Sequence, residues 1–294
     1  MNAKTPLQLK LQKDTGLTID KISSSQELEG FLDRGLADLY RSVFAEPPYL
    51  ESFSQDEAKE CFRDYLAKKG NIFIATDPAR KDKIVAFLVS IPLRTRFDLA
   101  AQAKDYVDAD KAAYFADTGV DPAYRRLGLS VSLKGLLFEA NRNAGFKEEL
   151  SRTSQDSYKQ ISAFNKVGGR VIAGLFQDVA SKRLDGTTTT DRRIFYAYDV
   201  MNQEKDAAAA TSVGRVIIAR DAGKDTAYVM SKVEQKDQAS LEKRIKTSYA
   251  GVTRVAFTSR PQEIKGNVVF DGRLYLSKEP SAPRKGNSGP KIAL

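Results

Sequence analysis

Apolar residues near the start of the chain follow strand and helix periods in turn. Leu7, Leu9 and Leu11 alternate with polar residues, which predicts a short strand. Residues 17–22 predict a second strand, and the apolar positions of residues 28–43 recur at helical spacing. We therefore expect one long amphipathic helix there, because a Ser and a Glu at capping-box spacing come just before it.

Further along, helices and strands interleave. Ser54 and Glu57 repeat the capping-box pattern, which predicts a helix to about Lys68. After Pro122 the apolar period is again helical, and it ends at Gly145. The remaining runs predict a helix over residues 156–167 and strands over residues 71–76, 83–93, 112–120, 149–153, 170–178 and 192–200. This order predicts an α/β fold built on one mixed α+β sheet.

A polar and Ala-rich stretch at residues 202–212 interrupts this pattern and predicts a linker after a first domain, residues 1–201. Residues 213–280 contain four strand-like runs and one helix-like run, which indicates a small basic α+β unit. Residues 281–294 are rich in Pro, Gly, Ser and basic residues, so we expect a flexible basic tail.

Composition excludes several kinds of chemistry. The chain has no His and a single Cys, Cys61. Zinc sites built from these residues, histidine-dependent catalysis and an internal disulfide are therefore excluded, and we expect no metal. No apolar run approaches the roughly 20 residues that span a bilayer, and residues 1–13 lack the apolar core of a secretory signal. We expect a cytoplasmic protein with no membrane partner.

The last third of the chain carries most of the basic excess. Residues 201–294 contain 17 Lys and Arg against 10 Asp and Glu, in a chain of formal net charge +9. Such a balance attracts phosphate-rich partners such as nucleic acid. No RNA-binding signature is present, and a charge cluster is usually a solvated face. Nucleic-acid binding is therefore one alternative, and a homodimer contact is another.

The segment that bears on chemistry is residues 120–130, between a predicted strand and an amphipathic helix. Free N–H groups and the dipole at a helix start bind anions. Gly128 allows a phosphate to approach the main chain closely, and Arg125 and Arg126 add positive charge. No phosphate-binding loop of the GxxxxGK[ST] type is present. Taken alone, the segment is also compatible with an ordinary turn between a strand and a helix.

The same segment resembles the signature of the GCN5-related N-acetyltransferase (GNAT) superfamily, V-x-P-x-x-[RQ]-x-x-G-x-[GA]. Val120, Pro122, Arg125 and Gly128 match in register, and Ser130 stands where the family has Gly or Ala. The order of predicted elements over about residues 15–200 is also similar to that family. The resemblance implies the GNAT acyl-CoA acyltransferase fold, with the smaller C-terminal α+β unit outside it.

The resemblance also implies that acetyl-CoA binds as cosubstrate. Its diphosphate would be held by the main-chain amides of Arg125, Arg126, Leu127, Gly128, Leu129 and Ser130. Val120 would pair its backbone with the pantetheine arm, and its strand would splay from the strand over residues 149–153 to admit the thioester.

Two carboxylates are candidates for the general base that removes a proton from the amine. Glu46 lies in the loop that borders the acceptor pocket in similar proteins, and Asp117 lies on the strand that leads into the signature. Phe164 stands where many members have a proton-donating Tyr, which makes Tyr158 a substitute acid. Glu149 is expected to be an exposed charge at the start of a strand.

The sequence therefore predicts an acetyl-CoA-dependent N-acetyltransferase that acts on a primary amine of a small molecule or peptide. Two alternatives stay open. One is an acetyltransferase that modifies RNA or protein and docks its substrate on the basic C-terminal unit. The other is a non-catalytic acyl-CoA sensor, which the missing Tyr favours slightly without displacing the acetyltransferase.

Overall fold

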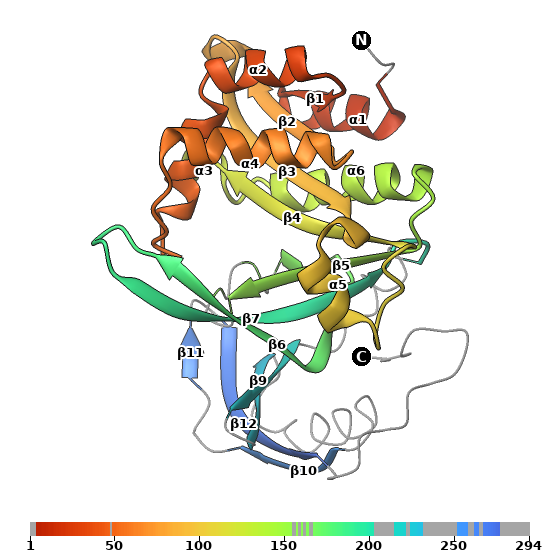
Figure 1. Ribbon diagram of the computed structural model, residues 1–294, viewed down its shortest axis with the longest axis vertical. Helices are drawn as coiled ribbons and strands as arrows, with labels where there is room; N and C mark the ends of the chain where they lie inside the picture. The colour runs from red at the N-terminus through yellow and green to blue at the C-terminus, as the bar shows by residue number, and fades with distance from the viewer. Residues whose placement is uncertain are drawn as a thin grey trace.

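The computed structural model describes residues 4–47, 49–154, 157, 160, 163, 164 and 167–202, and then residues 215–221, 224–231, 252–257, 262–264 and 267–276. Seven strands form one mixed sheet in the order β1-β2-β3-β4-β5-β7-β6 (Figure 1). They are β1 (Thr18–Ile22), β2 (Asn71–Asp77), β3 (Lys83–Pro92), β4 (Ala112–Val120), β5 (Glu148–Ser154), β6 (Arg170–Lys182) and β7 (Thr188–Asp199). Only β4 and β5 pair in parallel. The predicted mixed α+β sheet is therefore confirmed.

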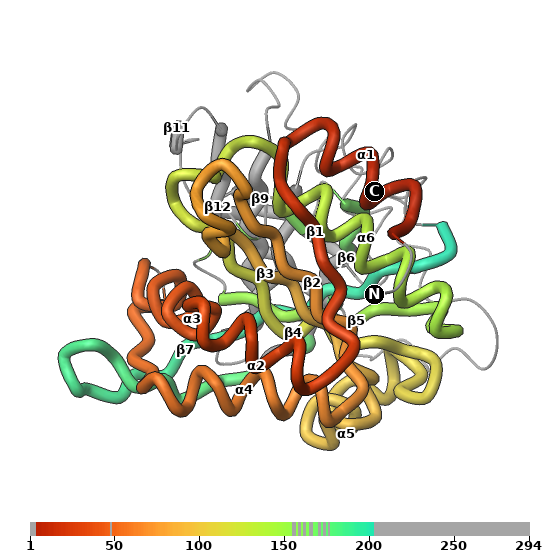
Figure 2. Tube along the Cα trace, turned by 90° about the horizontal axis from the view of Figure 1, so that it is seen from above, coloured from red at the N-terminus to blue at the C-terminus, as the bar shows by residue number. Residues whose placement is uncertain are grey.

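Helices cover both faces of this sheet (Figure 2). They are α1 (Pro6–Thr15), α2 (Ser25–Asp33), α3 (Leu36–Phe44), α4 (Gln55–Ala67), α5 (Phe97–Ala103) and α6 (Leu129–Asn143). One core lies between the sheet and α1 with α6, and a second lies between the sheet and α2, α3, α4 and α5. Along β2, Phe73 enters the first core, whereas Ile72 and Ile74 enter the second. This period of two explains why β2 and β3 are apolar along nearly their whole length.

The prediction of a strand over residues 7–11 is wrong, because these residues form α1. Thr5 caps the helix in a reciprocal capping box with Gln8, and Pro6 occupies its first turn. Gly16 ends the helix in the left-handed conformation, with φ of 71°. The local capping residues therefore determine the structure here, and the alternating leucines do not: Leu11 is buried, whereas Leu9 is 56% exposed.

The long helix expected over residues 28–43 is two helices. Gly35 has φ of 101°, which a right-handed helix does not allow, and the chain turns there between α2 and α3. The predicted helix from Ser54 is confirmed as α4, with both arms of its capping box formed. Helix α5 was not predicted; it lies between β3 and β4 and packs Leu99 into the second core.

Five further strands form a second, antiparallel sheet, in the order β10-β12-β9-β8 with β11 paired to β12. They are β8 (Arg215–Asp221), β9 (Lys224–Ser231), β10 (Val252–Phe257), β11 (Gln262–Ile264) and β12 (Asn267–Leu276). The four strands expected after the linker are thus present. The linker, the helix-like run that follows β9 and the tail lie outside the described residues, so the domain division stays a prediction. No helix in the described ranges is long and apolar enough to cross a membrane.

Candidate functional site

The two parallel strands at the centre of the sheet pair over only part of their length. Ala112–Phe115 of β4 pair with Glu148–Ser151 of β5. Beyond Phe115, β4 continues beside β3 as far as Val120, whereas β5 continues beside β7 as far as Ser154. The main-chain edge of β4 over residues 116–120 is therefore not paired with β5, and the two strands part at Phe115.

A turn at the end of β4 presents main-chain amides to solvent. Arg126 has φ of 70° and Gly128 has φ of 76°, and α6 begins at the next residue. Within the described part of the chain, the amides of residues 126–131 donate no hydrogen bond. Leu127 is 68% exposed, and the Arg126 side chain is exposed beside it. Unpaired amides at a helix start, next to an arginine, form a favourable place for an anion.

The neighbouring residues of this segment have structural contacts. Arg125 donates from Nε to the Val120 carbonyl oxygen (2.9 Å), and its guanidinium forms two hydrogen bonds to the Glu46 carboxylate (2.5 and 2.9 Å). Leu129 is buried in the core below α6, and Ser130 lines a small cavity. The predicted candidate Glu46 is thus bound to the turn by Arg125.

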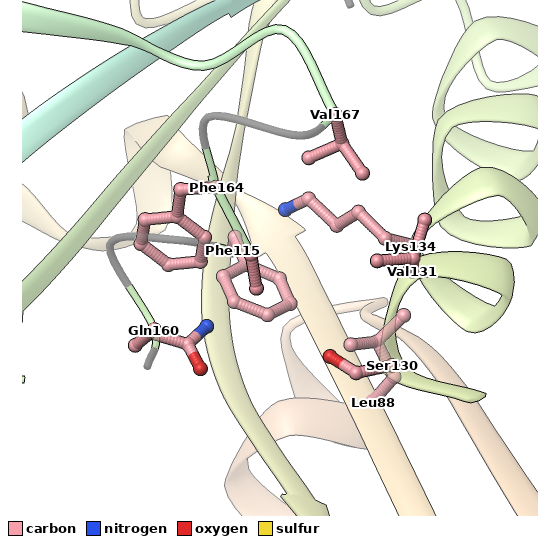
Figure 3. Close-up of a pocket in the computed structure, with 9 residues that line it drawn as sticks. Leu88, Phe115, Ser130, Val131, Lys134, Gln160, Phe164 and Val167 are labelled. Carbon is pink, nitrogen blue, oxygen red and sulfur yellow. The ribbon is translucent and has the colours of Figure 1, made fainter. Parts of the chain in front are cut away.

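That small cavity, of about 10 Å³, lies where β4 and β5 part (Figure 3). Its lining residues are Leu88, Phe115, Ser130, Val131, Lys134, Gln160, Ala163, Phe164 and Val167. Phe115, Gln160 and Phe164 also line a much larger cavity of about 710 Å³. The start of α6, the point where the strands part and the large cavity are therefore adjacent.

Asp117 lies in the wall of the large cavity. Its carboxylate accepts hydrogen bonds from the hydroxyls of Tyr40 (3.1 Å) and Tyr65. Burial raises the pKa of Asp117 to about 6, while the two tyrosine hydroxyls act in the opposite direction. A carboxylate with this pKa is ionised at neutral pH and accepts a proton more readily than an ordinary Asp.

Cys61 lines the same cavity, and burial raises the pKa of its thiol to about 11. The thiol is therefore protonated at neutral pH, so Cys61 is not an activated nucleophile. Tyr49 and Phe44 also line this cavity. The described residues contain no group of His, Cys, Asp and Glu side chains that could hold a metal ion.

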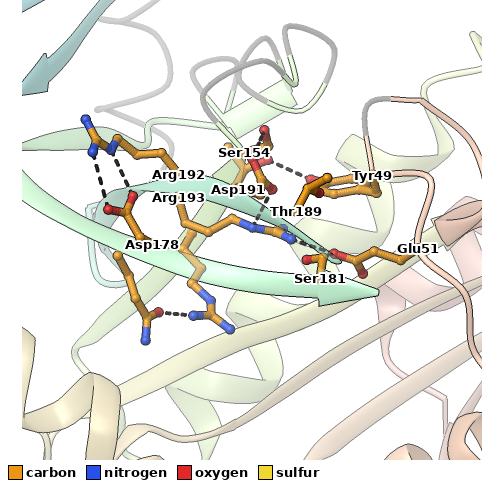
Figure 4. A network of polar contacts seen from close by, with 12 residues as sticks. Tyr49, Glu51, Ser154, Asp178, Ser181, Thr189, Asp191, Arg192 and Arg193 are labelled. Carbon is orange, nitrogen blue, oxygen red and sulfur yellow. Dashed lines mark hydrogen bonds and ion pairs between the residues drawn. The ribbon is translucent and has the colours of Figure 1, made fainter. Parts of the chain in front are cut away.

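A network of polar contacts includes Tyr49, Glu51 and Arg193, which also line the large cavity (Figure 4). Arg193 of β7 pairs with Glu51 (2.7 Å) and Asp191 (2.8 Å), and its guanidinium lies 4.8 Å from the centre of the Tyr49 ring. The Tyr49 hydroxyl lies 2.9 Å from the hydroxyl of Thr153. These contacts join the loop after α3 to β5 and β7, so the cavity wall is built from distant parts of the chain.

The expectation that Glu149 is an exposed charge is wrong, because this residue is fully buried. It forms an ion pair with Lys134 of α6, which is itself 3% exposed, and accepts a hydrogen bond from Asn141 (2.6 Å). Glu149 is buried because α6, which carries Lys134 and Asn141, covers the face of β5 on which its side chain lies. Sequence analysis did not identify Lys134, although it falls among the leucines of the apolar stripe of α6.

Lys134 adjoins the small cavity, and its Nζ lies 3.4 Å from the centre of the Phe115 ring. Burial lowers its pKa to about 8, against the opposing influence of Glu149.

Phe164 is buried against Phe115 and Tyr196, at ring-centre distances of 5.7 and 5.1 Å. Tyr158, the candidate acid from the sequence, lies outside the described residues.

No protein-family model matches this chain, and no curated protein matches its sequence. Solved structures do resemble it. A protein from Salmonella typhimurium assigned as an acetyltransferase, with its cofactor acetyl-CoA, matches at 11% identity and a TM-score of 0.44, over 63% of this chain and 94% of that one. The ribosomal-protein-S18-alanine N-acetyltransferase of Escherichia coli matches at 16% identity and a TM-score of 0.42, over 63% and 94%.

A third similar structure, from Chromobacterium violaceum, is assigned to the GNAT family and matches at 15% identity and a TM-score of 0.43, over 64% of this chain and 90% of that one. At these identities and scores the likeness assigns no substrate and no residue role. Many of the solved structures that this chain resembles are acetyltransferases, GNAT-family proteins among them.

Proposed function

We propose that this chain is an acetyl-CoA-dependent N-acetyltransferase that transfers an acetyl group directly to a primary amine of a small molecule or peptide. The observation that carries the proposal is the parting of β4 and β5 between the unbonded amides of residues 126–131 and the cavity that contains Asp117. An anion-binding turn, an open strand edge and a proton acceptor are thus neighbours in the fold. This arrangement is the one that direct transfer from a coenzyme A thioester requires.

The residues of the turn and of β4 suit coenzyme A. The amides of residues 126–131 and the exposed Arg126 would bind its diphosphate. The side chain of Arg125 is bound to Glu46, so Arg125 would shape the turn and not contact the diphosphate with its guanidinium. The open edge of β4 towards Val120 offers main-chain groups to the amides of the pantetheine arm. When bound, acetyl-CoA supplies the acetyl group and a thiolate leaving group.

Asp117 is the group that we assign as general base. It lies in the wall of a cavity whose volume of about 710 Å³ falls in the range of small-molecule sites. The hydroxyls of Tyr40 and Tyr65 hold the carboxylate in place and leave it ionised at neutral pH. Asp117 would take a proton from the acceptor amine as its nitrogen attacks the thioester carbonyl carbon.

Carboxylates on α4 support an amine as the acceptor. Glu57, Glu60 and Asp64 of α4 line the large cavity and are exposed. Glu60 and Asp64 are paired with Arg63 and Lys68, and the same cavity is also lined by Arg96, Arg152, Lys182 and Arg193, so these carboxylates offer hydrogen-bond acceptors to an amine and not a wall of one charge. Asp117, in the wall of the same cavity, would take the amine proton as the nitrogen attacks.

The test is release of free thiol from acetyl-CoA in the presence of a panel of primary amines. We expect turnover by the full chain and a loss of kcat in Asp117→Asn of about 10²–10⁴-fold, the usual contribution of a general base. Glu46→Gln tests the other carboxylate that was a candidate base; because Glu46 binds Arg125 of the turn, we expect this variant to change coenzyme A binding more than kcat. If the chain bound acetyl-CoA but transferred its acetyl group to no amine, we would conclude that it is an acyl-CoA-binding protein and not an enzyme. A larger loss in Glu46→Gln would reassign the base.

A further inference from the structure

The buried ion pair between Lys134 and Glu149 has no part in the mechanism above. Lys134 extends from α6 to the small cavity, and its ammonium points into the space among Phe115, Phe164 and Val167 (Figure 3). The aromatic rings of Phe115, Phe138 and Tyr198 have their centres 3.4, 5.1 and 4.7 Å from Nζ. A buried ammonium in apolar surroundings is costly unless it is paired. Glu149 supplies that pairing, so the ion pair keeps a proton donor at the cavity that adjoins the proposed thioester path.

The position of Lys134 relative to β4 and β5 is informative. Phe115 is the last residue of β4 that pairs with β5, so the ammonium that lies over its ring is at the point where the strands part. Phe115 belongs to the core on the α6 side of the sheet. Asp117 is hydrogen-bonded to Tyr40 and Tyr65, which lie on the α3 and α4 side. The proposed base and the ammonium of Lys134 therefore approach the same opening from opposite faces of the sheet.

The contacts around Glu149 allow Lys134 to act on a proton. Glu149 pairs with the ammonium and also accepts a hydrogen bond from Asn141, whose side-chain oxygen accepts hydrogen bonds from Asn71 and Ser90. Glu149 is the only carboxyl group that the described residues pair with Nζ; burial raises the pKa of Glu149, against the influence of Lys134 and Asn141. The phenol of Tyr198, whose pKa is also raised by burial, faces Nζ from β7. Burial lowers the pKa of the Lys134 ammonium to about 8, which is close to the pKa of an ordinary thiol, about 8.5. Proton transfer between two such groups is nearly balanced.

We propose that Lys134 is a catalytic residue that donates a proton from Nζ to the sulfur of coenzyme A as the thioester breaks. This inference rests on the proposed acetyltransferase function. The amine nitrogen forms its bond to the carbonyl carbon, the C–S bond breaks, and the electron pair of that bond stays on sulfur. Sulfur takes a proton from Lys134, while the amine proton goes to Asp117. Proton exchange with solvent returns both side chains to their starting states after the products leave.

The test is the pKa of the thiol of bound coenzyme A, read from the ultraviolet absorbance of its thiolate and requiring neither acceptor nor turnover. A neighbouring ammonium favours the thiolate, so the pKa should fall below about 8.5 in the wild-type complex. In Lys134→Met it should rise by about one unit or more, which is a tenfold smaller thiolate fraction at a given pH. Lys147→Met, which removes an exposed lysine beyond α6, should leave the thiol pKa unchanged.

Two further measurements keep the outcome decisive. Lys134→Met alone leaves Glu149 buried and unpaired, so the double variant Lys134→Met/Glu149→Gln provides a folded protein without the charge. In that variant we expect kcat to fall about 10²–10⁴-fold, with coenzyme A affinity little changed. Two results would overturn the role of Lys134 and leave the acetyltransferase function intact. One is that the thiol of coenzyme A has the same pKa when bound to the wild type as it has free in solution. The other is that the bound thiol has the same pKa in the wild type and in the double variant. Failure of the wild type to bind coenzyme A overturns both.

Discussion

The diphosphate site at the start of α6 leads to a sharp prediction for Gly128→Glu. Gly128 has φ of 76°, and a Cβ atom added there meets no atom within 4 Å. A non-glycine residue in this conformation lowers the free energy of unfolding of the protein by about 1–2 kcal/mol. The new carboxylate would also stand beside the proposed diphosphate site. At about 6 Å and an effective dielectric constant of about 20, repulsion by one phosphate charge amounts to about 3 kcal/mol. Coenzyme A should therefore bind about 100-fold more weakly.

Gly145→Glu is the matched control for this substitution. Gly145 follows the other end of α6, has φ of 88° and also offers open space to a Cβ atom. Both variants should therefore lose a similar free energy of unfolding in urea, while only Gly128→Glu should lose coenzyme A affinity in calorimetry. Gly128→Ala separates strain from charge and should bind coenzyme A nearly as well as the wild type. Equal affinity of the two Glu variants would refute the diphosphate site.

Three further predictions concern the base and the two ion pairs. The rate of acetyl transfer should rise with pH through about 6 as Asp117 loses its proton. Tyr65→Phe should move this rise to higher pH, because it removes a hydrogen-bond donor that stabilises the carboxylate. The same pH–rate profile in the variant and the wild type would contradict the assignment of Asp117 as the base. Lys134→Met should lower the free energy of unfolding by about 3–5 kcal/mol, and adding Glu149→Gln should recover most of the loss. If urea unfolding gave the same low stability for the double variant, lost packing and not the unpaired charge would be the main cause. Glu46→Gln should lower stability by no more than about 1 kcal/mol, because its side chain is 36% exposed; a larger loss would mean that the loop after α3 depends on this pair.

Local signals in the sequence predicted most of the elements around the site. The strand that becomes β4, the turn with Gly128 and the amphipathic helix α6 all follow from residues that are close in sequence. The capping box of Ser54 and Glu57 likewise places the start of α4. Such interactions join residues three or four positions apart, so their patterns are visible without a fold. The failure at residues 7–11 has the same origin, because a short alternation of leucines is weaker information than a capping box with a proline in the first turn.

The environment of each candidate residue was not visible in the sequence. Asp117 was a candidate because of its strand, but its raised pKa depends on burial and on Tyr40 and Tyr65, which are 77 and 52 positions away. Glu149 was expected to be exposed, since a pair of glutamates at a strand start is usually solvated. Its burial follows from the packing of α6, with Lys134 and Asn141, over that face of β5, and no local pattern contains this contact.

The amino-acid sequence by itself determined where α6 starts and which segments form most of the strands, because both depend on residue type and near neighbours. Its composition, without histidine, excluded histidine-dependent catalysis. Only the tertiary structure decided that β4 and β5 part beyond Phe115, that Arg125 binds Glu46, and that Lys134 meets Glu149 below the rings of Phe115 and Tyr198. The physical reason is that desolvation and charge pairing act between whatever groups the fold brings together, however far apart they lie along the chain.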